Sequence, residues 1–303
     1  MNFLVLGGTG FIGTKICSVL AQSGHAVRAY SPSAGRTEFS DNITGVSGLI
    51  ADKGELTKQV EWCGTVIHLV STTNPKTSFS DPYHDVSSNL LPLVQLLEII
   101  RTFDNKKIIF CSSGGTVYGM ARSLPIKEDH PKNPSTSYGL VKSAMEDYIQ
   151  FYNANYQLPF LIVRPANVYG PKLRSIGEQG IISTLVYNAL NKKETNCWAN
   201  PSNIRDYVFI EDFADALMSL INVNAEGIFN VGSGKGYVLN EIIASVEKIM
   251  KEKMKINFSG EKLKDEPSNV LDISKINTLT GWLPKTSLES GIHAIHLQLS
   301  SQS

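Results

Sequence analysis

The sequence lacks an excess of charge of either sign. Its 303 residues include 28 basic and 28 acidic side chains, so the formal net charge is zero. Nucleic-acid-binding proteins normally carry a clustered basic excess, and this balance therefore argues against one. It does not exclude a small anionic ligand, because a pocket can be locally basic on a neutral protein. With 42% hydrophobic residues, the chain is also too apolar to be disordered.

Cysteine pairs and long apolar runs are also lacking. The four cysteines, Cys17, Cys63, Cys111 and Cys197, are far apart, with no C-x-x-C pair and no cluster with histidine at metal-ligand spacing. No apolar run approaches the roughly 18 residues that a membrane-spanning helix needs. The sequence opens on a strand pattern, without a basic leader. We therefore expect a cytoplasmic protein without a disulfide scaffold, a metal site or a membrane span.

The first half of the chain alternates patterns that are typical of β-strands and α-helices. Short apolar runs indicate strands buried on both faces, and longer periodic segments indicate helices. Repeated alternation of this kind predicts an α/β fold with a doubly wound parallel sheet and right-handed crossovers. Strands are predicted at residues 3–6, 25–30, 65–70, 107–111 and 160–164, and helices at residues 12–22, 86–101 and 137–153.

After residue 165 the elements become shorter and the loops richer in glycine and proline. A length of 303 residues suggests about two domains. We expect a first domain over residues 1–165, to which residues 205–232 return, and a smaller mixed α/β domain from residues 166–204 and 233–303. Shorter strands are predicted at residues 207–210 and 228–231, and helices at residues 211–222 and 240–251.

A glycine-rich turn lies between the first predicted strand and the first predicted helix. Gly7, Gly10 and Gly13 occur there in the sequence G-G-T-G-F-I-G. Such glycines let the backbone approach a pyrophosphate, and the free N–H groups that open the helix, at Phe11 and Ile12, would bind phosphate oxygens. The strand-turn-helix context favours a Rossmann-type dinucleotide-binding site over an ordinary glycine turn.

The end of the second strand bears on the choice between NAD and NADP. The G-x-x-G-x-x-G spacing resembles the short-chain dehydrogenase/reductase superfamily, in which an acidic residue at this point binds the adenosine ribose of NAD. Here Ser31 follows Tyr30, and no acidic residue occurs before Glu38. Ser31 could bind the ribose of NAD. Alternatively, because no carboxylate stands here to repel the 2′-phosphate of NADP, Arg36 could pair with that phosphate. The expected cofactor is NAD or NADP.

A tyrosine and a lysine lie four residues apart in the predicted helix 137–153. The segment Tyr138-Gly-Leu-Val-Lys142 places both on one helix face. A free phenol has a pKa of about 10 and is a poor base at neutral pH. A neighbouring ammonium and a positive nicotinamide ring would lower that pKa, so that Tyr138 could exchange a proton with a sugar or alcohol hydroxyl during hydride transfer.

Four motifs narrow the resemblance. F-C-S-S-G-G-T-V-Y-G, N-P-S-T-S-Y-G-L-V-K, R-P-A-N-V-Y-G-P and R-D-Y-V-F-I-E-D occur in this order, and similarity runs from Gly7 to a G-W-L-P stretch that ends at Pro284. Together they resemble the extended short-chain reductases of the NAD-dependent epimerase/dehydratase family. The resemblance implies a dinucleotide-binding domain, a substrate-binding domain, and a nucleotide-diphosphate sugar bound between them. It also implies a homodimer through helices 86–101 and 137–153, although intramolecular packing could equally cover those helices.

The catalytic set of this family includes a hydroxyl at the end of the strand before the tyrosine. Many relatives place it four positions before the equivalent of Tyr118, where this sequence has Gly114. Epimerases with a similar S-T-G-G stretch use the hydroxyl directly before the two glycines, so Ser113 is the first candidate and Thr116 the second. The hydroxyl would hydrogen-bond the substrate oxygen. Ser112 is expected to face the nicotinamide from the strand end.

The resemblance also implies cofactor contacts outside the glycine turn. Asp52 would lie on the adenine side, although it could merely cap a helix. Leu69 would line the cofactor site at the end of its strand. Pro165 would turn the chain toward the nicotinamide carboxamide, or it could only end the strand.

Substrate contacts are implied in the second half of the chain. Asn167 would offer its amide to the sugar diphosphate, and Arg205 would clamp the diphosphate, unless it pairs with Asp206. One departure from the family lies near the C-terminus. Many relatives have an arginine shortly before a D-x-S-K segment, but none precedes Asp272 here, and Lys264 could replace it only as a point charge.

The leading hypothesis is a 4-epimerase of a UDP-hexose or UDP-N-acetylhexosamine. Tyr138 would take the O4 proton while the C4 hydride passes to NAD, and the hydride would return to the other face of a rotated 4-keto sugar. A dehydratase is disfavoured, because Gly115-Thr116 stands where dehydratases have Asp-Glu. The close alternative is an NADPH-dependent reductase of a dTDP- or GDP-4-keto-6-deoxyhexose. A non-catalytic dinucleotide-binding regulator is a more distant alternative, which the Tyr138 and Lys142 pair argues against.

Overall fold

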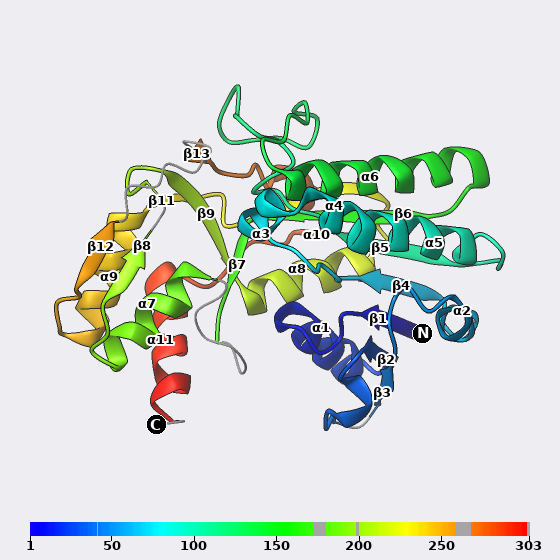
Figure 1. The fold of residues 1–303 in the computed structure, drawn as a ribbon, viewed down its shortest axis with the longest axis horizontal. Helices are drawn as coiled ribbons and strands as arrows, with labels where there is room; N and C mark the ends of the chain where they lie inside the picture. The colour runs from blue at the N-terminus through cyan, green and yellow to red at the C-terminus, as the bar shows by residue number, and fades with distance from the viewer. Residues whose placement is uncertain (41, 172–179, 198–199, 259–267, 302–303) are drawn as a thin grey trace. The chain divides into compact units, whose positions relative to one another are not determined.

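In the computed structural model, one seven-stranded sheet has the order β10-β6-β5-β4-β1-β2-β3 (Figure 1). Neighbouring strands from β3 to β6 are parallel, and Leu6 of β1 lies opposite both Tyr30 and His68. The chain winds outward from β1 in both directions, so the predicted Rossmann-type doubly wound sheet is confirmed. The strands are β1 (Asn2–Leu6), β2 (Ala26–Ser31), β3 (Ile43–Ser47), β4 (Thr65–His68), β5 (Lys107–Cys111), β6 (Phe160–Pro165) and β10 (Gly227–Val231).

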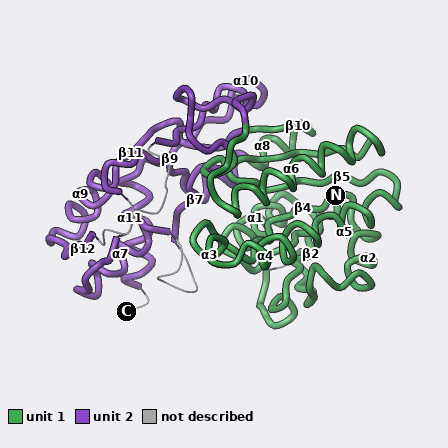
Figure 2. Tube along the Cα trace, turned by 45° about the horizontal axis from the view of Figure 1, so that its top comes forward, with its two compact units in different colours: residues 1–117, 132–164, 217–229 green, residues 118–131, 165–216, 230–303 purple. Residues whose placement is uncertain are grey.

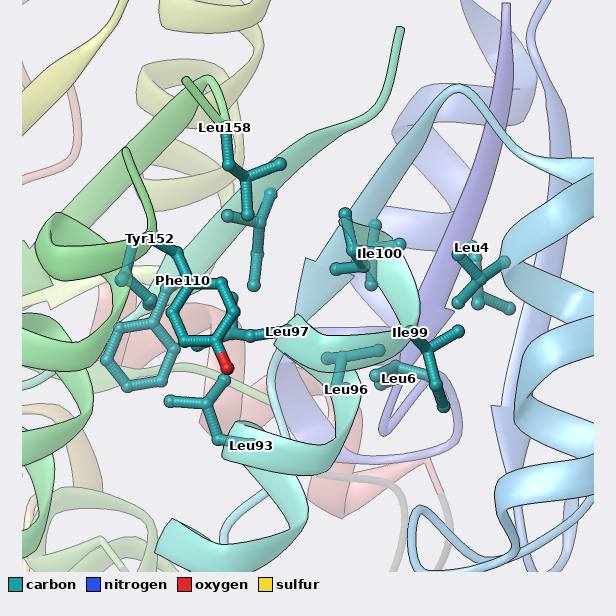
Figure 3. Packing of buried hydrophobic residues seen from close by; sticks show 14 of the residues in the cluster. Leu4, Leu6, Leu93, Leu96, Leu97, Ile99, Ile100, Phe110, Tyr152 and Leu158 are labelled. Carbon is teal, nitrogen blue, oxygen red and sulfur yellow. The ribbon is translucent and has the colours of Figure 1, made fainter. Parts of the chain in front are cut away.

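Helices cover this sheet because its strands are apolar on both faces. Leu4 and Leu6 of β1 join a buried cluster with Leu96 and Tyr152 (Figure 3). Phe3 and Val5 alternate with them along the strand and are also buried. The cluster draws its helical side chains from α2 (Lys53–Trp62), α5 (Leu91–Ile100) and α6 (Ser137–Tyr156). The helix α1 (Phe11–Gln22) packs against β1 and β2. The helices α3 (Pro75–Ser80) and α4 (Pro82–Asp85) and the π-turn Val86–Leu90 connect β4 to α5.

The structure describes residues 1–40, 42–171, 180–197, 200–258 and 268–301. They divide into two units (Figure 2). Unit 1 contains residues 1–117, 132–164 and 217–229, and unit 2 contains residues 118–131, 165–216 and 230–303.

The division differs from the sequence-based boundaries in two long stretches, and residues 165 and 230–232 also belong to unit 2 and not to the first domain. Residues 205–216, which were predicted to return to the first domain, belong to unit 2 because β9 (Ile204–Phe209) pairs there with three other strands. Residues 118–131 leave the first domain because Ile126 hydrogen-bonds the backbone of Val270 and Asp272, each at 2.8 Å. Pairing between distant segments, which local patterns do not report, accounts for both differences.

Unit 2 has a smaller mixed sheet, as predicted. β9 pairs antiparallel with β11 (Gly236–Val238) and parallel with β13 (Ser268–Asn269) and β7 (Asn167–Tyr169). β8 (Thr195–Cys197) and β12 (Ile256–Phe258) form a separate parallel pair. The helices are α7 (Ile181–Leu190), α9 (Leu239–Met250), α10 (Ser274–Thr280) and α11 (Leu288–Ser300), together with the first part of α8 (Ile210–Asn222).

Within the described ranges, no helix is long and apolar enough to cross a membrane. The same residues include no group of three or more His, Cys, Asp or Glu side chains that could hold a metal ion. Cys17, Cys63, Cys111 and Cys197 are all buried free thiols.

Candidate active site

The glycine turn is packed too tightly for side chains at two of its positions. A Cβ atom at Gly13 would lie 2.0 Å from the Gly7 oxygen, and one at Gly8 would lie 2.7 Å from the Ala29 Cβ. Gly7 has a φ of +83°, and its carbonyl accepts from the Gly10 N–H at 3.0 Å. The turn therefore requires glycine for its conformation and for the close approach of α1 to β1.

The first turn of α1 can receive an anion. Gly10 is the N-cap, and among the described residues no side chain caps this helix end. The first turn, which begins with Phe11 and Ile12, carries no acidic residue that would repel a phosphate. The backbone N–H groups and the positive end of the helix dipole thus fit the pyrophosphate of a dinucleotide.

Three hydroxyls meet at the end of β2, where the resemblance would place a carboxylate. The Thr9 Oγ1 lies 2.8 Å from the Ser31 Oγ and 3.1 Å from the Ser33 Oγ. Ser31 is buried, and Arg36 is exposed on the short 3₁₀ turn Ala34–Arg36. Serine stands here where the resemblance would place a carboxylate, so the position fits a ribose hydroxyl and Ser31 itself does not repel a ribose phosphate.

Asp52 and Leu69 have clear structural roles. The Asp52 carboxylate caps α2 by accepting from the Glu55 N–H at 3.1 Å, as the alternative interpretation held. Its proposed adenine contact stays a prediction. The backbone of Leu69 runs beside the glycine turn, because a Cβ at Gly7 would lie 3.3 Å from the Leu69 carbonyl carbon. Leu69 also continues the sheet by donating to the Leu6 carbonyl at 3.0 Å.

Tyr138 and Lys142 are brought together at the start of α6. Thr136 caps this helix by accepting from the Gly139 N–H at 3.1 Å, so Tyr138 lies in its first turn. The buried Lys142 Nζ lies 5.8 Å from the centre of the Tyr138 ring and donates to the Cys111 carbonyl at 3.0 Å. The spacing in the sequence thus does place the phenol and the ammonium on one helix face, next to the end of β5.

The protonation of this pair is governed first by burial. Burial raises the pKa of the Tyr138 phenol, and a hydrogen bond with the Ser71 side chain opposes that rise. Burial also lowers the pKa of Lys142, whereas the nearby Cys111, Glu146 and Asp85 raise it. The expected lowering of the Tyr138 pKa by Lys142 is not seen in the chain itself, where burial dominates and the side chains that shift this pKa are Cys111, Ser71 and Asp85. A positive nicotinamide ring would act in the lowering direction.

Ser112 faces the interior of the molecule. Its hydroxyl is buried and donates to the Glu146 Oε1 at 2.5 Å. Any contact of Ser112 with a nicotinamide would therefore come from its backbone, which differs from the expectation that the side chain faces the ring.

Ser113 and Thr116 form the turn between Ser112 and Tyr118. The half-buried Ser113 accepts at its carbonyl from the Thr116 and Val117 N–H groups at 3.3 and 3.1 Å. The Thr116 Oγ1 is buried, and no described group hydrogen-bonds it. The Thr116 carbonyl lies 2.8 Å from where a Gly139 Cβ would be, beside the first turn of α6. Thr116 thus has an unpartnered hydroxyl close to the backbone that carries Tyr138.

A buried ion pair that the sequence motifs do not reveal lies behind this site. Glu146, one helical turn after Lys142, accepts from the Arg164 Nε at 3.0 Å and from its Nη2 at 2.6 Å. Both side chains are almost fully buried, and the Lys132 Nζ lies 3.6 Å from the same carboxylate. This bidentate pair fixes the end of β6 and, through Ser112, the end of β5.

The proposed substrate residues lie in unit 2. The Asn167 Nδ2 donates to the Asp206 carbonyl at 2.9 Å, so this amide holds β7 to β9. The Arg205 Nη1 donates to the Ile204 carbonyl at 2.8 Å. The buried Asp206 carboxylate accepts from the N–H groups of Ser233, Gly234 and Leu271 at 2.8, 3.2 and 3.3 Å. Pro165 is buried at the end of β6, and Lys264 lies outside the described residues.

Comparison with known proteins identifies the family. The sequence profile of the NAD dependent epimerase/dehydratase family matches residues 3–232. The chain belongs to this family.

Relatives of known or assigned activity match over almost the whole length. A putative UDP-glucose 4-epimerase from Methanocaldococcus jannaschii is 33% identical over 302 residues, which cover 96% of each chain. A dTDP-4-dehydro-6-deoxyglucose reductase from Escherichia coli is 29% identical over 299 residues, covering 95% of this chain and 94% of the relative. The crystal structure of the Thermotoga maritima UDP-glucose 4-epimerase with UDP-glucose superimposes with a TM-score of 0.92 at 28% identity, covering 100% and 99% of the two chains.

Proposed function

We propose that this member of the epimerase/dehydratase family interconverts the C4 epimers of a UDP-hexose or UDP-N-acetylhexosamine. The observation that carries the proposal is the Tyr138 and Lys142 pair, with the ammonium 5.8 Å from the phenol ring. Lys142 bonds the Cys111 carbonyl at the carboxyl end of β5, the edge at which open parallel sheets bind their ligands. The similarity to UDP-glucose 4-epimerases supports the choice of sugar nucleotide.

Each candidate residue receives a role in this proposal. NAD, when bound, supplies the acceptor and donor of the C4 hydride. The turn from Gly7 to Gly13 holds its pyrophosphate, and Leu69, Ser112 and Pro165 line its nicotinamide end. Tyr138 takes the proton from O4 and returns it, Lys142 orients the phenol, and Ser113 or Thr116 hydrogen-bonds the same oxygen.

Unit 2 supplies the substrate contacts in this proposal. Asn167 and Arg205 would bind the diphosphate of the sugar nucleotide, with the guanidinium providing a two-pronged donor. Since Asn167 also holds β9, its replacement by Ala is expected to loosen that strand as well as weaken binding. Unit 1 is accordingly the dinucleotide-binding unit and unit 2 the substrate-binding unit.

The direct test offers UDP-glucose and UDP-N-acetylglucosamine to the purified protein without added cofactor. Appearance of the galacto epimer, resolved by ¹H NMR, supports the proposal. Turnover that survives Tyr138→Phe would contradict the assigned role of the phenol.

A second candidate function is NADPH-dependent reduction of a dTDP- or GDP-4-keto-6-deoxyhexose. The hydroxyl cluster of Thr9, Ser31 and Ser33 favours it, because no carboxylate there repels a 2′-phosphate and Arg36 is nearby. The similarity to the E. coli reductase points the same way. Stoichiometric NADPH consumption with the keto sugar, and no epimerisation of either UDP-sugar, would replace the first proposal by this one.

Ser31→Asp separates the two cofactors. The new carboxylate would repel the 2′-phosphate, so the ratio of the Kd for NADP to the Kd for NAD is expected to rise. Fluorescence titration measures both constants without turnover, and an unchanged ratio would contradict the assigned role of Ser31. A non-catalytic regulatory protein, the third alternative, is eliminated by any turnover that Tyr138→Phe abolishes.

We also propose a cytoplasmic homodimer. Exposed apolar side chains gather on the two helices that the family resemblance assigns to the interface. On α6, the exposed Leu140, Tyr148 and Phe151 follow one another at helical spacing. Val86 and Leu91 are exposed on the preceding helical segment. A second copy of the chain would cover them. Light scattering should show a dimer, and Leu140→Glu should give a monomer; a monomeric wild-type chain would contradict this.

A further inference from the structure

A fully buried carboxylate connects the loop after β4 to the start of α6. Asp85, the last residue of α4, is 0% exposed. It accepts three side-chain hydrogen bonds, from the Thr73 Oγ1 at 2.6 Å, the Asn89 Nδ2 at 3.0 Å and the Ser137 Oγ at 2.8 Å. A buried carboxylate is costly unless it is bonded in this way. The arrangement therefore constrains every segment that supplies a donor.

One of these segments is the first turn of α6, which carries Tyr138. Ser137 is the first residue of that helix, and its hydroxyl is the donor to Asp85. The next backbone N–H, that of Tyr138, donates to the buried Ser78 Oγ at 3.1 Å. Two side-chain bonds, one to α4 and one to α3, thus fix where α6 begins and where the phenol is placed.

The other segment is the loop of residues 71–74, on the side of the phenol. Thr73 donates to the carboxylate, and the neighbouring Thr72 N–H donates to the Asn89 Oδ1 at 2.9 Å. Asn89 lies in the π-turn Val86–Leu90, a type of helix irregularity found frequently at functional sites. Ser71, at the start of the same loop, acts through its side chain to lower the pKa of the Tyr138 phenol, against the effect of burial. The carboxylate therefore holds both the backbone under Tyr138 and the loop whose first residue acts on the phenol.

The charge of Asp85 also acts on the catalytic pair. It raises the pKa of Tyr138 and also the pKa of Lys142. An ionised Asp85 thus favours a neutral phenol beside a charged ammonium. The other titratable groups that act on this pair or face it are Cys111 on β5, Glu146 on α6 and His68 on β4.

We propose that Asp85 is a positioning residue for the proton transfer at Tyr138, which it serves by anchoring Ser137 and Thr73 and by supplying a buried negative charge beside the Tyr138 and Lys142 pair. The proposal rests on the assigned role of Tyr138 in the proposed function. Asp85 touches neither reacting atoms nor cofactor in this role, and it acts through the residues that it holds.

The test compares Asp85→Asn with Ser137→Ala in the NAD-loaded enzyme. Asp85→Asn removes a charge that raises the pKa values of both Tyr138 and Lys142, so both limbs of the pH profile of kcat should move to lower pH. Ser137→Ala removes one anchor and leaves the charge. It should lower kcat by roughly tenfold through misplacement of the phenol and leave both limbs where they are.

Limbs that stay in place in Asp85→Asn, or that move to higher pH, would overturn the proposal. If Asp85→Asn does not fold, Asp85→Ser keeps a small polar side chain, removes the same charge and carries the same expectation. If Ser137→Ala has the wild-type kcat as well as the wild-type pH profile, the proposed anchoring of Ser137 by Asp85 is overturned.

A readout without turnover separates this inference from the proposed function. In protein labelled with ¹³C at the tyrosine ζ carbon, the Tyr138 signal is assigned by its loss in Tyr138→Phe. Its titration should begin at lower pH in Asp85→Asn than in the wild type, whichever sugar nucleotide is the substrate. If the onset of the Tyr138 titration is unchanged, the role of the Asp85 charge is overturned even in an active epimerase. If the onset shifts but the protein epimerises no sugar, the role of Asp85 stands and the proposed function does not.

Discussion

At the scale of single residues, the candidate active site depends on a few side chains whose positions follow from short-range geometry. Tyr138 and Lys142 meet because four residues span about one helical turn. Gly13 is required because α1 starts directly against the Gly7 carbonyl. Position also bears on the candidate hydroxyl. The Thr116 Oγ1 is buried, and no described group hydrogen-bonds it, which supports Thr116 beside Ser113 as the candidate.

Tyr138→Phe is expected to reduce kcat by about 10²- to 10⁴-fold, the range that general acid-base catalysis contributes. The substitution removes only the hydroxyl, so the fold and the pyrophosphate site remain. Stopped assays of C4 epimerisation measure the loss, and the content of bound NAD serves as the control. A variant with wild-type kcat would remove Tyr138 from the mechanism.

Gly13→Ala is expected to abolish dinucleotide binding and to lower the free energy of unfolding by about 1–3 kcal/mol. The added Cβ would lie 2.0 Å from the Gly7 oxygen, so the glycine turn must move. Gly54→Ala is the matched control, because Gly54 lies at an exposed position of α2 and its Cβ would meet nothing closer than 3.7 Å. That change should be neutral or stabilising by up to about 1 kcal/mol. Chemical denaturation and NAD titration of both variants provide the measurement.

At the scale of elements, the apolar strands and the longest helices could be predicted from the sequence. β5 has the predicted bounds, residues 107–111, because its side chains are buried on both faces and give a continuous apolar run. β3 was missed, and α2 was foreseen only through its Asp52 cap and without bounds, since β3 has no fully buried residue and α2 buries only Leu56, Gln59 and Val60. The predicted helix 86–101 is interrupted by the π-turn Val86–Leu90, close to Pro92, which has no N–H to donate.

The site was predictable only where a motif is local. The glycine turn and the Tyr138 and Lys142 pair lie in continuous segments, and the sequence therefore reveals them. Asp85 and Glu146 contact partners that lie 52 and 34 positions away in the chain, Ser137 and Ser112 respectively. Such contacts depend on how elements pack, and no spacing rule in a single sequence reports them.

The Glu146 and Arg164 pair should be the costliest of these element-level contacts to break. Glu146→Gln leaves the buried Arg164 charge without its counter-charge, so the free energy of unfolding should fall by about 3–5 kcal/mol. Asp147→Asn removes the neighbouring exposed partner of Lys132 and should cost less than about 1 kcal/mol. Urea denaturation distinguishes the two, and equal losses would show that burial of the pair does not matter.

At the scale of the whole molecule, a buried histidine links stability to pH. His68 at the end of β4 is 1% exposed, and burial together with Lys142 lowers its pKa to about 3. An unfolded histidine has a pKa of about 6.5, so below that pH the unfolded state binds the additional proton. This contribution to stability is complete above about pH 6.5 and is lost as the pH falls toward 3.

The expected loss from His68 is roughly 2 kcal/mol at pH 5 relative to pH 7. Urea midpoints at the two pH values measure it, and His68→Gln, which cannot titrate, provides the reference. A variant whose pH dependence equals that of the wild type would show that His68 is not the group responsible.

The whole molecule combines a sheet that fits a dinucleotide, a proton-transfer pair at the carboxyl ends of its strands, and a second unit with a separate mixed sheet. Neutral overall charge is compatible with this, because the groups assigned to the two diphosphates are local. They comprise the glycine turn and start of α1 in unit 1 and Arg205 in unit 2. The balanced charge argues against a nucleic-acid-binding protein, and a few placed donors suffice for a small anionic ligand.

In the proposed reaction, the hydride removed from C4 returns to the same carbon within one enzyme-bound cycle. Incubation with UDP-glucose deuterated at C4, without added nucleotide, tests this return. We expect UDP-galactose with deuterium still at C4 at unchanged enrichment, and no such product from Tyr138→Phe. Loss of the deuterium from C4, or conversion only when a reduced nucleotide is supplied, would contradict it.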